Sequence, residues 1–232
     1  MRGKMWFTFS VLFVVIQSIC ALVDVTIDQN LENAGFHRLL VTNITLYANL
    51  TSCNLLLEEK FPKHFYIADS ELENINQFSE VNLKLSHKLN VETTASESVP
   101  FSAFIFLNKS QPVVTSTEFR TNYLYSIPLR VRYHDPKTEG GVREFKKPPV
   151  ILYGRCPSGL SLPKGTVAKL LCDPYTSETC EWTTLSFTQK SLLPQILIPV
   201  GDTNHYPYVL VSTHISAYVG LFYLLCSLFI RS

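Results

Sequence analysis

The apolar positions of the chain form two continuous runs at its ends and shorter segments between them. The first run, residues 5–16, follows Arg2 and Lys4 and precedes small residues at positions 18, 20 and 21. This arrangement is typical of a secretory signal peptide, and the run is too short to cross a bilayer core about 30 Å thick. We therefore predict a signal peptide over residues 1–21, with an uncleaved anchor as the alternative.

The second run, residues 208–230, contains no Asp, Glu, Lys or Arg. As a helix it spans roughly 34 Å, enough to cross a membrane with some tilt. We predict a transmembrane helix over residues 206–230, a cytosolic tail of residues 231–232 and a lumenal domain over residues 22–205. The alternative is a GPI-attachment signal with its small-residue site at residues 201–203, but the spacer that follows is shorter than the usual length of about 8–12 residues.

His214 is a polar exception within the second run. A polar side chain in hydrocarbon tends to face protein, and the neighbouring Ser212 and Ser216 favour packing between helices. His214 is therefore a candidate contact with another membrane helix. The alternative is a neutral imidazole close enough to the interface to reach it.

The segment between the two runs has the pattern of short strands. Residues 127–133 alternate, with apolar side chains on one face and Arg130 and Arg132 on the other, and residues 81–85 alternate in the same way. Further apolar runs of strand length occupy residues 39–50, 53–57, 65–67, 101–107, 150–153, 183–187 and 196–200. Many short strands separated by turn residues predict an all-β, antiparallel sandwich-like lumenal domain plus one C-terminal transmembrane helix.

Two segments depart from this strand pattern. Ser70 and Glu73 have the spacing of a capping box, which predicts a short helix that continues to about Phe78. Residues 135–149 are rich in charge, Gly and Pro, and we predict a mobile loop there.

The cysteines and sequons fit an oxidising, lumenal compartment. Four cysteines fall between the two end runs: Cys53, Cys156, Cys172 and Cys180. Four cysteines allow three pairings. The short spacing of the last two favours a local bridge, which would leave the first two to join the halves of the domain; the other pairings stay open. Three sequons are candidates for N-glycosylation, at Asn43, Asn49 and Asn108.

Catalytic motifs are not evident. The formal net charge is +1, which gives no reason to predict a nucleic-acid partner. The chain has no GxSxG, HExxH or P-loop pattern. The acid pair Asp69 and Glu71 lies at the predicted helix start, where carboxylates stabilise free amides. We therefore predict no catalytic residue, cofactor or metal site.

Five blocks follow one another in the order found in the PIG-X family. They are residues 28–42, Cys53 with the LLLEEKFPKHFYIADSEL segment, the strand IPLRVRYHDP at residues 127–136, the cysteine–tryptophan block at residues 172–182, and residues 198–201 before the apolar run. Together they resemble PIG-X, the small non-catalytic subunit of GPI mannosyltransferase I. The candidates for family signature or interface are Gly35, Phe36, His37, Arg38, Arg130, Arg132, Tyr133, His134, Pro136 and Trp182.

The resemblance implies a specific role. Members of this family are single-pass type I proteins of the endoplasmic reticulum that bind and stabilise PIG-M, the multi-spanning mannosyltransferase. That enzyme adds the first mannose of the GPI core from dolichol-phosphate-mannose. The chain is therefore expected to be a stabilising, essential and non-catalytic subunit in GPI-anchor biosynthesis. The alternative function is a cell-surface binding module, single-span or GPI-anchored. Residues 90–121 and 135–149 carry no family hallmark.

Overall fold

The computed structural model describes residues 25–46, 53–79, 81–107, 113–115, 118–157, 162, 165–191 and 195–231. The predicted signal peptide lies outside the described residues, as do the sequon asparagines Asn49 and Asn108. Asn43 is described and is exposed.

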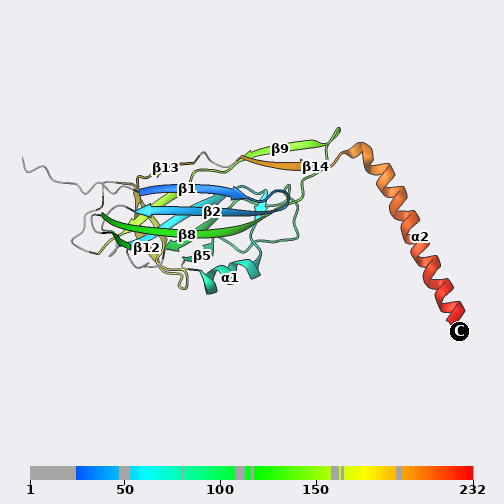
Figure 1. Cartoon of the computed structure of the whole chain (residues 1–232), viewed down its shortest axis with the longest axis horizontal. Coiled ribbons are helices and arrows are strands. Elements are labelled where there is room, and N and C mark those ends of the chain that lie inside the picture. The colour runs from blue at the N-terminus through cyan, green and yellow to red at the C-terminus, as the bar shows by residue number, and fades with distance from the viewer. Residues whose placement is uncertain are drawn as a thin grey trace, which may run out of the picture.

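Two six-stranded sheets form the body of the described chain (Figure 1). The first contains, in order, β13 (Thr188–Gln189), β1 (Val25–Glu32), β2 (His37–Leu46), β8 (Glu118–Val131) and β4 (Phe65–Tyr66), with β7 (Val113–Thr115) paired to β8. The second contains, in order, β11 (Val167–Leu171), β12 (Thr179–Leu185), β10 (Ile151–Arg155), β3 (Asn54–Phe61), β6 (Phe101–Leu107) and β5 (Val81–Leu85). All the strand pairs are antiparallel except the short pair of β1 and β13. The structure thus confirms the predicted all-β class.

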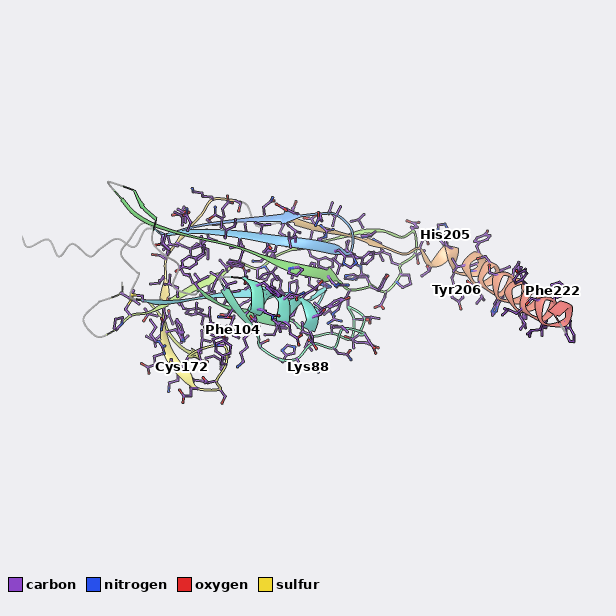
Figure 2. All side chains as sticks on the ribbon, turned by 60° about the horizontal axis from the view of Figure 1, so that its bottom comes forward. Lys88, Phe104, Cys172, His205, Tyr206 and Phe222 are labelled. Atoms are coloured by element: carbon purple, nitrogen blue, oxygen red, sulfur yellow. A yellow bond between two sulfur atoms is a disulfide. The ribbon has the colours of Figure 1, made fainter. Side chains whose placement is uncertain are left out.

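One apolar core lies between the two sheets, because side chains of alternating strand residues point inward from both. In β2 and β8 the ladder places Leu40 opposite Ile127 and Ile44 opposite Tyr123, and all four are buried. The facing strand β3 contributes Leu55 and Leu57 to the same core; Figure 2 shows side chains filling the space between the sheets.

The prediction of a mobile loop over residues 135–149 is wrong. This segment contains β9 (Gly141–Lys146), which pairs with β14 (Gln195–Val200) to form a two-stranded ribbon. The β14 side chains Ile196 and Ile198 are buried in the main core, which fixes the ribbon against the sandwich. β9 itself has almost no apolar periodicity because most of its side chains are exposed, so its pattern gave no strand signal.

Both disulfides join neighbouring strands of the second sheet at or next to the strand ends. Cys53 bonds to Cys156 across the paired strands β3 and β10, and Cys172 bonds to Cys180 at the β11–β12 hairpin. This is the pairing that the short spacing favoured. Cys226 is free.

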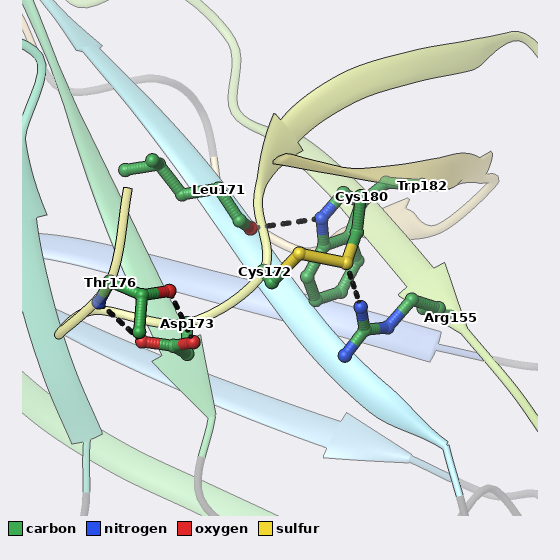
Figure 3. The surroundings of a disulfide bond; sticks show 7 residues. All are labelled: Arg155, Leu171, Cys172, Asp173, Thr176, Cys180 and Trp182. Atoms are coloured by element: carbon green, nitrogen blue, oxygen red, sulfur yellow. Dashed lines mark hydrogen bonds between the residues drawn. A yellow bond between two sulfur atoms is a disulfide. The ribbon is translucent and has the colours of Figure 1, made fainter. Parts of the chain in front are cut away.

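A second, smaller core covers the outer face of this sheet. It is built on Trp182, Leu56, Phe106 and Tyr153. The Trp182 indole N–H donates to the Leu171 carbonyl at 3.0 Å, and the Arg155 guanidinium lies 5.2 Å from the ring centre and donates to Cys180 Sγ (Figure 3).

The short helix α1 (Asp69–Phe78) begins earlier than its predicted capping box. Its N-cap is Ala68, and the Glu71 carboxylate accepts a hydrogen bond from the Ala68 N–H at 3.3 Å. Ser70 and Glu73 are exposed, so the predicted pairing of these two residues is wrong. Two residues separate the helix from the end of β4, which leaves Glu71 rather than Glu73 at the N3 position.

The chain ends in α2 (Tyr206–Arg231), preceded by the short 3₁₀ turn η1 (Thr203–His205). Among the described residues, this is the one helix long and apolar enough to cross a membrane, and it fits a single-pass membrane protein. It extends away from the sandwich, and over residues 206–225 its side chains are exposed (Figures 1 and 2). We call the end of the sandwich where β14 leads into α2 the α2 end.

Candidate functional site

The predicted segments around residues 35–38 and 130–134 meet at the α2 end. In the β2–β8 ladder His37 lies opposite Arg130, and the Val131 N–H donates to the Phe36 carbonyl at 2.8 Å. The rings of Phe36 and Tyr133 lie 4.9 Å apart. Two segments far apart in sequence are therefore neighbours in one sheet.

The backbone of Gly35 forms part of the turn that leads into the first of these segments. It adopts φ +84° in the turn between β1 and β2, a conformation that residues with a Cβ rarely adopt. The turn is held by Arg38, whose Nε donates to the Gly35 carbonyl at 3.1 Å. Arg38 Nη2 also donates to the Leu197 carbonyl of β14 at 2.7 Å. Arg38 thus connects the first sheet to the ribbon that leads into α2.

The two arginines of the RVRYH strand have different environments. Arg130 donates through Nε and Nη2 to Glu71 Oε1 at 3.1 and 2.8 Å, which fixes α1 to the sheet and raises the pKa of Arg130. Arg132 is buried, with 4% of its surface exposed. Its Nη1 donates to the Thr93 carbonyl at 2.8 Å, and its guanidinium lies 4.9 Å from the Tyr66 ring centre. Each of the two side chains therefore connects this strand to a segment distant in the sequence.

His134 lies in an aromatic stack that includes Phe145 of β9. Its ring centre is 4.8 Å from that of His64 and 5.3 Å from that of Phe145. Burial is the main cause that lowers the pKa of His64 to about 4, and the nearby His134, Lys63 and Arg143 lower it further. Burial also lowers the pKa of His134. Both imidazoles are therefore neutral near pH 7.

This stack predicts a stability that depends on pH. The pKa of His64 is about 4 in the folded chain and about 6.5 in an unfolded chain. Between these values the unfolded state binds more protons, so the free energy of unfolding falls as the pH falls from about 6.5 to about 4. Denaturant unfolding of the full chain in detergent, followed by Trp182 fluorescence, measures this. His64→Gln should flatten the dependence, whereas substitution of the exposed His87 should not; equal slopes for both variants would contradict the assignment.

Of the other predicted residues, Pro136 also lies at the α2 end, whereas Trp182 and His214 do not. Pro136 is exposed and adjoins Gly201, where an added Cβ would lie 3.6 Å from its Cβ. Trp182 belongs to the small outer core. The neighbouring Cys172 lies far from Tyr206, the first residue of α2, so this core is remote from the α2 end (Figure 2). His214 is exposed on α2, with its ring 6.5 Å from that of Tyr218. The structure therefore gathers the glycine–arginine turn and the RVRYH strand, but not Trp182 or His214.

A buried polar network was missed by the sequence analysis. Lys147 Nζ lies 2.5 Å from Glu59 Oε2, and the two side chains are 2% and 0% exposed. Gln29 Nε2 donates to Glu59 Oε1 at 2.5 Å and to Thr42 Oγ1 at 3.1 Å, while Lys147 Nζ donates to Gln29 Oε1 at 3.2 Å. One signal was available, because Glu59 has the same parity along β3 as the inward Leu55 and Leu57. Among the described residues, no three His, Cys, Asp or Glu side chains are grouped to hold a metal ion.

A protein-family model described as PIG-X / PBN1 matches residues 33–229. The match includes the segments that meet at the α2 end, both disulfides and nearly all of α2. Comparison with curated proteins gives no match.

Proposed function

Because the chain belongs to the PIG-X / PBN1 family, we propose that it is the stabilising, non-catalytic subunit of GPI mannosyltransferase I. The family is an accessory family associated with the mannosyltransferase step of GPI-anchor biosynthesis, and it implies partnership with a mannosyltransferase subunit. The observation that carries the proposal is the continuous match from the sandwich into α2. The proposed partner is the multi-spanning, PIG-M-like enzyme that transfers the first mannose.

The proposed orientation places the sandwich in the lumen of the endoplasmic reticulum. Two disulfides support this, since such bonds persist in oxidising compartments. The sequon residue Asn43 supports it too, because its side chain is exposed on the outer face of β2. The family is associated with the endoplasmic reticulum, and α2 has the length and composition of a single span.

The proposed mechanism is stabilisation by binding. The α2 end of the sandwich contacts lumenal loops of the enzyme, and α2 packs along its membrane helices, where His214 is the candidate polar contact. A subunit that binds only the folded enzyme stabilises it by mass action, by about 2.7 kcal/mol when its free concentration is 100 times Kd. Loss of the subunit then lowers the level of folded enzyme rather than the chemistry of each enzyme molecule.

Deletion of the gene tests this proposal directly. We expect both the level of the mannosyltransferase and the surface display of GPI-anchored proteins to fall, and both to recover when the chain is restored. Rescue by expressing more of the enzyme alone would separate stabilisation from a direct role in transfer. Unchanged enzyme level and GPI display would contradict the proposal and favour a cell-surface binding module.

A further inference from the structure

β9 forms one edge of the ribbon at the α2 end. Among the described residues its one strand partner is β14, which lies between β9 and the sandwich (Figure 1). An unpaired strand edge presents backbone N–H and C=O groups that another chain can pair with. Natural proteins usually cover or shorten such edges, so an open edge near an expected interface is informative.

The direction of the free backbone groups follows from two features of β14. The Leu197 carbonyl accepts from Arg38, so it points away from β9, and Pro199 has no N–H to donate to β9. In an antiparallel ladder, residues opposite such positions also point away from their partner. Val142 lies opposite Pro199 and Glu144 lies opposite Leu197. These two β9 residues therefore direct their N–H and C=O groups to the open edge.

The ribbon is held firmly next to the start of α2. The Lys137 N–H donates to the Gly201 carbonyl at 3.0 Å, and the Thr203 N–H donates back to the Lys137 carbonyl at 3.1 Å. The Asp202 carboxylate accepts from the Glu139 N–H at 3.1 Å. Since β9 begins two residues after Glu139, its open edge starts beside the junction with the membrane helix.

The side chains of the ribbon suit an extended peptide. Val142 and Leu197 share one face and are 54% and 55% exposed, next to the exposed Pro199. Arg143 points to the other face, is exposed and forms no ion pair among the described residues. An added strand would place an apolar side chain beside Val142 and an acidic one beside Arg143.

We propose that the open edge of β9 binds an extended lumenal segment of the partner mannosyltransferase, which adds to the ribbon as a third strand. This inference rests on the proposed function, from which the partner is taken. The edge is adjacent to α2, so lumenal loops of a multi-spanning partner packed on α2 emerge next to it. Main-chain pairing of this kind gives affinity, and the alternating side chains give specificity.

Glu144→Pro tests the edge while sparing the backbone pairing of the ribbon. Proline removes the outward N–H of residue 144, and the N–H groups that pair with β14 belong to the adjacent residues. The matched control is Glu144→Ala, which keeps the N–H and loses the same carboxylate. In cells that lack the endogenous chain, we expect Glu144→Pro to reduce co-purification of the enzyme at least about fivefold. The reason is that one backbone hydrogen bond is lost and the proline ring clashes with the added strand. Glu144→Ala should co-purify as the unsubstituted chain does.

Photo-crosslinking gives a second measurement if Glu144→Pro fails to fold. Benzoylphenylalanine at position 142 should form an adduct with the mannosyltransferase, and at the exposed position 28 on the outer face of the first sheet it should not. An adduct with a second copy of this chain, or none, would overturn the proposal. If Glu144→Pro folds and co-purifies fully, the edge is not the site. The proposed function then still stands if deletion lowers enzyme level and GPI display.

Discussion

Lys147→Met is expected to destabilise the sandwich by about 3–5 kcal/mol, because it leaves the buried Glu59 carboxylate without its ion-pair partner. Water cannot take over the role of the ammonium, since the Glu59 side chain is 0% exposed. Single-domain proteins unfold at a total cost of about 5–15 kcal/mol, so this one substitution would remove a large part of the stability.

Replacing both charges should be less harmful than replacing one. Glu59→Leu with Lys147→Met removes the desolvation cost of two ions, which often makes such double replacements neutral or stabilising. Recovery should be partial here, since the Gln29 amide loses two partners and keeps Thr42. Unfolding of both single variants and the double variant, followed by Trp182 fluorescence, completes the cycle. If the losses in unfolding free energy of the two single variants add up to the loss of the double variant, the two charges do not interact in the folded protein.

The buried network of Glu59, Lys147 and Gln29 could not be predicted from the sequence alone. The alternation of apolar and polar residues predicted β5 and the end of β8, because their apolar residues face the main core and their polar residues face away from it. Glu59 and Gln29 break this rule, since both occupy inward positions and their partners come from other strands or from the segment after β9. A polar residue at an inward position is stable only with a partner, and the partner is a property of the fold.

Arg132 and β9 illustrate two further limits. Arg132 alternates with the apolar side chains of its strand, yet the loop containing Thr93 covers it. β9 has few apolar residues, and its strand form depends on β14, more than 50 residues later in the sequence. The resemblance to the family located the two segments that meet at the α2 end, but only the ladder register showed that they are neighbours.

Loss of the Cys53–Cys156 disulfide is the second change with a large expected effect. The bond closes a loop with a sequence separation of 103 residues, whereas Cys172–Cys180 closes one of 8. Loop-closure entropy in the unfolded chain makes the long bridge worth about 4.7 kcal/mol and the short one about 2.5 kcal/mol. Replacing both members of each pair by alanine should reproduce this order.

The native contacts around the two bridges make the comparison informative. Cys53 and Cys156 flank a ladder that already pairs Asn54 with Arg155, so the long bridge acts mainly on the unfolded chain. The short bridge instead adjoins Trp182, whose indole bonds to Leu171 next to Cys172. Denaturant unfolding under non-reducing conditions measures both losses. A larger loss for the Cys172–Cys180 pair would mean that this bridge organises the small outer core in the folded state, and loop entropy would then be the lesser part of its contribution.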